Sequence, residues 1–139
     1  MKTAVVYWSG TGNTELMANS VADGAKAAGA DVSVFTASEF SAAKLEEFDC
    51  VAFGCPSMGD EQLEEGESEP MFVSCIPVLQ KKKVALFGSY GWGDGAWMRS
   101  WEDTCRNNGI VLAADSVICC GAPDDGAKAE LAEIGKALA

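Results

Sequence analysis

The stretch SGTGNT at residues 9–14 decides the fold, because it joins the apolar run TAVVYW at residues 3–8 to an amphipathic segment that begins at Glu15. Such an order indicates a buried strand, a tight loop and the start of a helix. A helix N-terminus carries unpaired N–H groups and the positive end of the helix dipole, and both attract phosphate. The sequence therefore predicts an anion site formed by Ser9, Gly10, Thr11, Gly12, Asn13 and Thr14.

This loop contains no Lys or Arg. Its two glycines allow the backbone to approach an anion closely, and its three hydroxyls add neutral donors. Neutral donors favour a monophosphate over a triphosphate with magnesium. The loop matches neither GxxxxGK[ST] nor GxGxxG, because residue 15 is Glu. The alternative interpretation is a small-residue turn that caps a helix.

The composition fits one soluble domain, residues 1–139, of 139 residues in all. The chain has no apolar stretch that could cross a membrane and no signal-peptide pattern, so we expect a cytoplasmic protein. Its net charge of −11 disfavours nucleic acid and favours a basic protein partner. Acids cluster at residues 61–69, although acidity also serves solubility alone.

The sequence predicts no metal site. It contains no histidine, and no two of its six cysteines have CxxC spacing. We interpret the cysteines mainly as small buried residues in a reducing compartment. They are Cys50, Cys55, Cys75, Cys105, Cys119 and Cys120.

Apolar runs alternate with helical patterns along the whole chain. Expected strands cover residues 3–8, 31–35, 49–55, 83–88 and 116–120, with residues 110–113 as a possible start of the last. Expected helices begin at Glu15, near Ser41, and at about residues 68, 96 and 127; the first buries Leu16, Met17, Ser20, Val21, Gly24 and Ala28. This alternation predicts an α/β fold whose parallel sheet is covered by helices on both faces.

Two further loops should meet the first at the same edge of the sheet, because the strands are parallel. The third strand is followed by Pro56, Ser57, Met58, Gly59, Asp60 and Glu61, and the fourth by Ser89, Tyr90, Gly91, Trp92 and Gly93. A flat heteroaromatic ring fits between Met58 and Trp92, and Glu61 can accept from an imide N–H. The alternatives are core packing for Tyr90 and solvated acids for Glu61, Glu64, Glu65, Glu67 and Glu69.

The motifs YWSGTGNT, GCPSMGDEQLEE and FGSYGWGDG resemble the three flavin-binding loops of short-chain flavodoxins, in the same order and at similar spacing. The resemblance covers essentially the whole chain. It implies the flavodoxin-like α/β fold, a doubly wound five-stranded parallel sheet in the order 2-1-3-4-5. It also implies non-covalently bound FMN and a low-potential one-electron carrier that passes through semiquinone and hydroquinone states. Redox proteins with basic docking surfaces would be its partners, and we expect a monomer.

The resemblance also implies a role for each loop. Residues 9–14 would bind the phosphate, Met58 and Trp92 would lie on the two faces of the isoalloxazine, and Glu61 would accept from N3–H. The carbonyl of Gly59 would turn towards N5 on reduction. Backbone groups of residues 89–93 would meet the pyrimidine edge. Pro56 lacks a hydroxyl and an N–H, so no phosphate or ribityl contact is placed on its side chain.

Three other functions are weighed against the carrier, which is not an enzyme. A flavin-dependent quinone reductase on the same fold is the main alternative, but the chain shows no evident nicotinamide site or catalytic base. A signalling receiver domain needs an aspartate after the third strand, where this chain has Cys55 and Pro56. A module that only stores flavin would lack a stable semiquinone.

Overall fold

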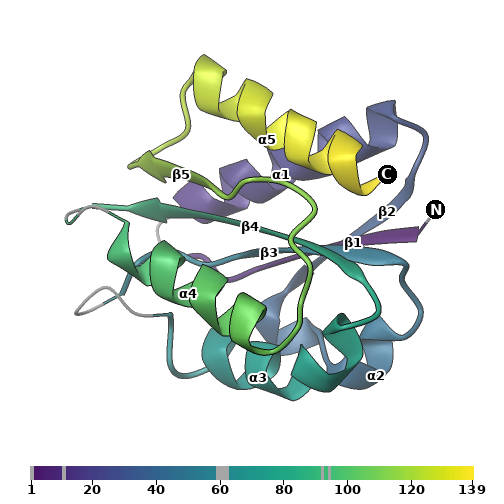
Figure 1. The fold of residues 1–139 in the computed structure, drawn as a ribbon. Helices are drawn as coiled ribbons and strands as arrows, with labels where there is room; N and C mark the ends of the chain where they lie inside the picture. The colour runs from purple at the N-terminus through teal and green to yellow at the C-terminus, as the bar shows by residue number, and fades with distance from the viewer. Residues whose placement is uncertain (1, 11, 59–62, 92, 94) are drawn as a thin grey trace.

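A parallel sheet of five strands lies at the centre of the computed structural model, which describes residues 2–10, 12–58, 63–91, 93 and 95–139 (Figure 1). The strand order is β2-β1-β3-β4-β5 and every pair is parallel, as predicted. The strands are β1 Lys2–Tyr7, β2 Asp31–Thr36, β3 Cys50–Gly54, β4 Lys83–Tyr90 and β5 Val117–Cys120.

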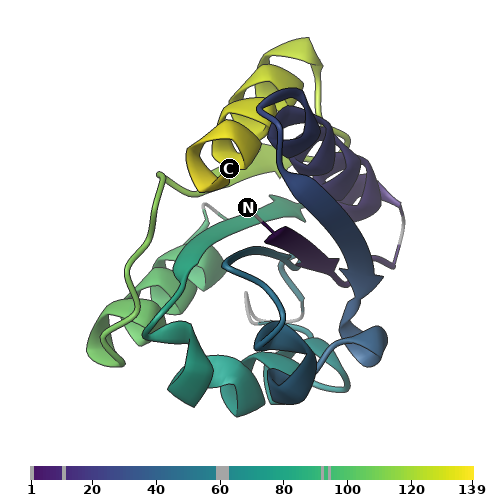
Figure 2. The same cartoon turned by 90° about the vertical axis from the view of Figure 1, so that its right-hand side faces the viewer.

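Helices cover both faces of this sheet. In Figures 1 and 2, α1 and α5 lie on one face and α2, α3 and α4 on the other. The α-helices are α1 Asn13–Ala27, α2 Ala42–Leu45, α3 Ser68–Leu79, α4 Ala96–Asn107 and α5 Asp125–Leu138, and a 3-10 helix, η1, spans Ala37–Glu39. The sequence did not predict η1, which begins with a capping box between Thr36 and Glu39.

The strands are continuous apolar runs because both faces of the sheet are buried. Across the sheet, Val5, Ala52 and Ala85 are in register and join the core under α1 and α5. The next row includes Phe53 and Leu86, which join the core under α2, α3 and α4. Successive residues of the central strands thus point into two different cores, and neither face of these strands is exposed to solvent.

Two sequence predictions need correction. In α1, Leu16 is 46% exposed and Ala28 lies exposed beyond the helix, whereas Ala18, Ala22 and Ala25 are buried. The buried stripe is rotated because α1 packs against α5 as well as the sheet. The last strand is also shorter than expected: residues 110–113 contribute only an isolated bridge between Val84 and Leu112.

All strands point the same way, so the connections that follow β1, β3, β4 and β5 meet at the carboxyl edge of the sheet. The described parts of the three predicted loops therefore come together at this edge.

In the described ranges, no helix combines the length and the apolar character needed to cross a bilayer.

Candidate functional site

A hollow of about 300 Å³ opens at the carboxyl edge of the sheet. It brings together parts of all three predicted loops, which are far apart in the sequence. Its lining is Trp8, Gly10, Asn13, Pro56, Ser57, Met58, Ser89, Tyr90, Gly91 and Gly121. Sequence reasoning anticipated all of these residues except Trp8 and Gly121.

Other predicted residues lie elsewhere or outside the described part. Ser9, Gly12 and Thr14 are in the first loop and the start of α1, next to the hollow rather than in its lining. Gly93 is described but does not line it. Thr11, Gly59, Asp60, Glu61 and Trp92 fall outside the described residues, so their roles stay predictions.

The first loop ends at a helix start that suits an anion. Gly12 precedes α1 with φ +98°, a left-handed conformation that glycine adopts without strain. Ser9 Oγ accepts a hydrogen bond from the Gly12 N–H at 3.0 Å, and its own proton remains available. Among the described residues, no side chain caps the first turn of α1. The N–H groups of that turn, beside the buried Thr14, can therefore bind an anion.

The second loop starts from a buried cysteine. Cys55 is fully buried, and its carbonyl accepts a hydrogen bond from Trp97 Nε1 at 3.1 Å. Burial raises the pKa of the Cys55 thiol to about 11, so the thiol stays protonated at neutral pH. It is thus a hydrogen-bonding group rather than a nucleophile. Its sulfur accepts from the N–H of Glu64, where the loop returns, at 3.3 Å.

Glu64 is not the solvated acid that the sequence suggested. It is half-buried, and its carboxylate accepts from the N–H groups of Gly66, Glu67 and Ser68 at 2.7, 2.7 and 2.9 Å. A run of acids in a sequence does not show which member turns back onto the chain. The feature that distinguishes Glu64 is its position four residues before the start of α3, where free N–H groups need acceptors.

The third loop is a continuation of β4. The prediction placed Ser89 and Tyr90 after the strand, but both belong to it, because they pair with Cys119 and Cys120 of β5. The strand end is tied to its neighbours: Ser89 O accepts from the Ser57 N–H at 3.0 Å. Tyr90 lies at the hollow and also 5.7 Å from the ring of Trp97, so it serves both the lining and the core.

The two lining residues that the sequence did not single out have clear structural roles. Trp8 follows β1, and its indole N–H donates to Glu67 Oε1 at 3.2 Å, which links the first loop to the turn before α3. Gly121 follows β5; its carbonyl accepts from Ser89 Oγ at 2.6 Å and its N–H donates to Tyr90 O at 2.9 Å. Trp8 could have been predicted to line the site, because it is an apolar residue at the carboxyl end of the first strand. Gly121 could not, because a single glycine after the last strand is no specific signal for a site.

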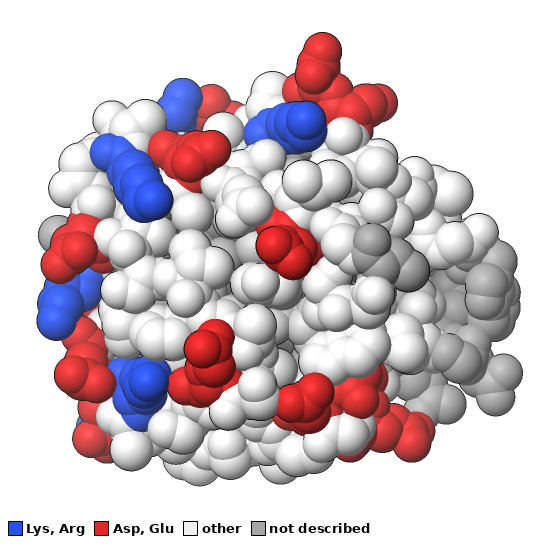
Figure 3. Space-filling model, turned by 180° about the vertical axis from the view of Figure 1, so that it is seen from behind, with Lys and Arg blue, Asp and Glu red and all other residues white. Residues whose placement is uncertain are grey.

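The connections at the carboxyl edge of the sheet carry acidic side chains and no cations. The connections at residues 8–12, 55–67, 91–95 and 121–124 contain no Lys or Arg, whereas Lys2 and Lys83 begin β1 and β4. Figure 3 shows one face of the molecule, on which blue side chains lie at the left and top among red ones. The hollow is thus bordered by connections that carry acids and no cations.

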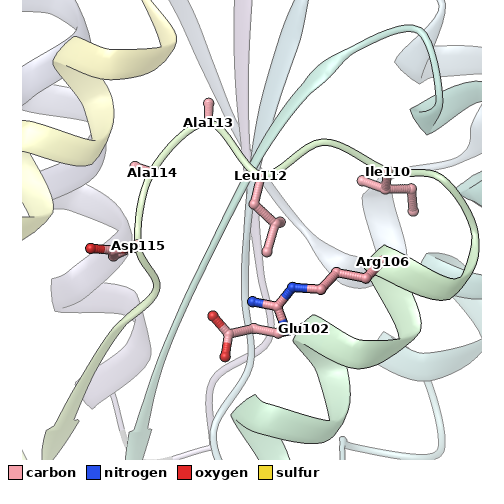
Figure 4. A pocket seen from close by; sticks show the side chains of 7 residues that line it. All are labelled: Glu102, Arg106, Ile110, Leu112, Ala113, Ala114 and Asp115. Carbon is pink, nitrogen blue, oxygen red and sulfur yellow. The ribbon is translucent and has the colours of Figure 1, made fainter.

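A larger hollow, of about 500 Å³, lies between α4 and the segment that leads to β5 (Figure 4). None of the predicted loop residues lines it. Two of its charged side chains are already engaged in the fold: Glu102 accepts from Ser116 Oγ at 2.9 Å, and Arg106 pairs with Asp103 at 3.3 Å. Within the described part of the chain, no cluster of three or more His, Cys, Asp or Glu could hold a metal ion.

The site and the fold match a known family. The sequence model of the family described as Flavodoxin matches residues 5–134. The chain is 44% identical to a flavodoxin from Clostridium beijerinckii over 97% of both chains, and 42% identical to one from Megasphaera elsdenii over 97% of this chain and 96% of that one. The solution structure of the two-electron reduced M. elsdenii flavodoxin superposes with a TM-score of 0.90, covering 98% of this chain and 97% of that chain.

Proposed function

Because the chain belongs to the flavodoxin family and so binds FMN and carries electrons, we propose that it is a low-potential one-electron carrier with FMN held non-covalently at the carboxyl edge of the sheet. In this proposal it shuttles electrons between redox proteins and has no catalytic activity of its own. The reducible isoalloxazine supplies the electron chemistry, and the protein supplies binding and electrostatics. The proposal covers residues 1–139 as one flavodoxin-like domain.

The residues present fit FMN. The uncapped first turn of α1, with Ser9, Gly12 and Thr14 beside it, offers neutral donors to a phosphate. The lining of the hollow next to it includes the thioether of Met58 and the ring of Tyr90, which suit contact with a flat ring. The phosphate and ring ends of FMN would therefore be held by separate parts of one continuous site. This adjacency is the observation that carries the proposal.

The charge distribution supports a low potential. The described acids at this edge, together with the phosphate of the cofactor, disfavour further negative charge on the bound ring. That penalty makes the fully reduced cofactor a strong reductant. The related M. elsdenii protein has been studied in its two-electron reduced form, which agrees with a carrier that uses this state.

The same charges favour basic partners. The connections at the carboxyl edge carry acids and no Lys or Arg, and the lysines that begin β1 and β4 lie at the opposite end of the sheet. A basic docking surface would be steered to the cofactor end first. We propose that the protein acts as a monomer in the cytoplasm, where its six free cysteines stay reduced.

An absorption spectrum of the purified protein, followed by a dithionite titration, tests this function. We expect a flavin spectrum in the oxidised protein and two separate one-electron steps on reduction. Absence of bound flavin, or one two-electron step, would contradict the carrier. Steady NADPH oxidation by the protein alone would instead support the quinone reductase alternative.

A further inference from the structure

We infer that Glu64 is a positioning residue for the ring-binding part of the site, because its carboxylate fixes the point where the second loop returns to the core. The inference rests on the proposed function, since it concerns how FMN is held. It assigns to the Glu64 carboxylate a task, the ordering of the turn before α3, that the exposed Glu65 beside it does not share.

The carboxylate of Glu64 organises the turn that follows it. One of its oxygens accepts from Gly66, and the other accepts from both Glu67 and Ser68. Three backbone donors on a single carboxylate hold the five consecutive residues 64–68 in one arrangement. The Glu64 carbonyl also accepts from the N–H of Glu69 at 2.9 Å. The start of α3 is thus built around this one residue.

The organised turn reaches both sides of the site. On one side, the Glu64 N–H donates to the sulfur of Cys55, the residue at which the second loop leaves β3. On the other side, Glu67 receives the indole N–H of Trp8, which lines the hollow. Glu64 therefore ties the returning end of the second loop to its buried start at Cys55, and through Glu67 it helps to position Trp8, a lining aromatic.

The chain offers a matched control one residue away. Glu65 carries the same charge, is exposed, and makes no side-chain hydrogen bond within the described residues. Glu64→Gln and Glu65→Gln therefore remove one negative charge each from nearly the same place. The glutamine at 64 keeps one acceptor oxygen, so at least one of the three N–H groups loses its acceptor. Any difference between the variants reports position rather than charge.

The experiment measures the dissociation constants of FMN and riboflavin for both variants and the wild type, at a temperature where circular dichroism shows all three folded. For Glu64→Gln we expect both ligands to bind about tenfold more weakly, because binding then has to order the loosened turn again, and ordering the backbone of one residue costs about that much. We expect Glu65→Gln to stay within about twofold of the wild type. Amide hydrogen exchange should accelerate at Gly66, Glu67 and Ser68 in Glu64→Gln only.

Riboflavin is the informative ligand, because it has the ring and lacks the phosphate. Unchanged riboflavin binding in Glu64→Gln, with faster exchange at the three amides, would overturn the inference and leave Glu64 as a helix cap. Equal weakening in both variants would also overturn it, because charge alone would then be responsible. Failure of the wild type to bind FMN would instead contradict the proposed function, so the two failures are distinguishable.

Discussion

Replacing Ser9 by alanine tests the phosphate site directly, because this hydroxyl has two separable tasks. Its oxygen already accepts the Gly12 N–H at 3.0 Å, which shapes the loop before α1. Its proton is then free to donate to a phosphate oxygen. The first interaction exists whatever ligand is bound, whereas the second exists only with FMN. A comparison of FMN with riboflavin therefore separates the two.

The expected magnitude follows from the partners. A hydrogen bond to a charged acceptor is worth about 1.5–3 kcal/mol, so FMN should bind about 10- to 150-fold more weakly to Ser9→Ala. The bond to Gly12 joins neutral groups and contributes about 0.5–1.5 kcal/mol. Its loss is shared by the free and bound protein, so riboflavin affinity should change by less than about threefold.

Quenching of flavin fluorescence on binding gives both affinities in one type of titration. Thr14→Val is a second variant, since Thr14 is 1% exposed and valine preserves its shape while removing the hydroxyl. Ser20→Ala is the control: its hydroxyl donates to Leu16 O at 3.3 Å in the same helix, away from the loop. If Ser9→Ala weakened FMN and riboflavin by the same factor, its hydroxyl would not contact the phosphate.

Three further predictions concern stability, pH and salt. Gly135→Ala should lower the free energy of unfolding by about 1–3 kcal/mol in urea denaturation, because the added Cβ would lie 2.1 Å from Val21 O in α1. Gly126→Ala in the same helix is the control, since its added Cβ would have no neighbouring atom nearer than 3.5 Å and should not be destabilising. Equal losses of stability in the two variants would refute the packing argument. Partial burial raises the pKa of Glu64, but hydrogen bonds from Ser68, Glu67 and Gly66 outweigh it and leave the pKa below its ordinary value. The resulting stabilisation is complete above the unfolded-state pKa and is lost as pH falls through the lower folded-state pKa. The difference in unfolding free energy between wild type and Glu64→Gln should therefore shrink as pH falls below the ordinary glutamate value of about 4.3, and a constant difference would contradict this prediction. The rate of electron transfer to a basic partner, measured by stopped flow, should fall as the salt concentration rises. The double variant Glu65→Gln and Glu69→Gln should show a weaker dependence on salt. A wild-type rate that does not change with salt would mean that these acids serve solubility only.

The sequence predicted the elements well because their signals are local. Ser41 is the N-cap of α2, with its side chain accepting from the Lys44 N–H, and α3 begins at Ser68 as expected. The meeting of the three loops also followed from topology, since parallel strands end at one edge. Local signals did not reveal that Ser89 and Tyr90 continue β4, because only pairing with β5 makes them strand.

Contacts between distant residues were the part that sequence reasoning missed. The stripe of α1 was misplaced because α5, more than 100 residues later, decides which side is buried. Glu64 was grouped with its acidic neighbours, since nothing in the spacing shows which carboxylate meets free N–H groups. The salt experiment above leaves out Glu64 and Glu67 for this reason: both hold structure together, so neutralising them would mix docking with folding.

The absence of cations from the first loop has a consequence for the proposed carrier. A lysine there would bind phosphate more strongly, but its charge would also stabilise negative charge on a nearby reduced ring and raise the potential. Backbone N–H groups and hydroxyls attract phosphate over a short range and contribute little net charge beyond it. The lysines that begin β1 and β4 are placed at the far end of the sheet. In the proposed carrier, tight binding of a dianion and a strongly reducing ring would thus be compatible, because dipoles rather than charges would hold the phosphate.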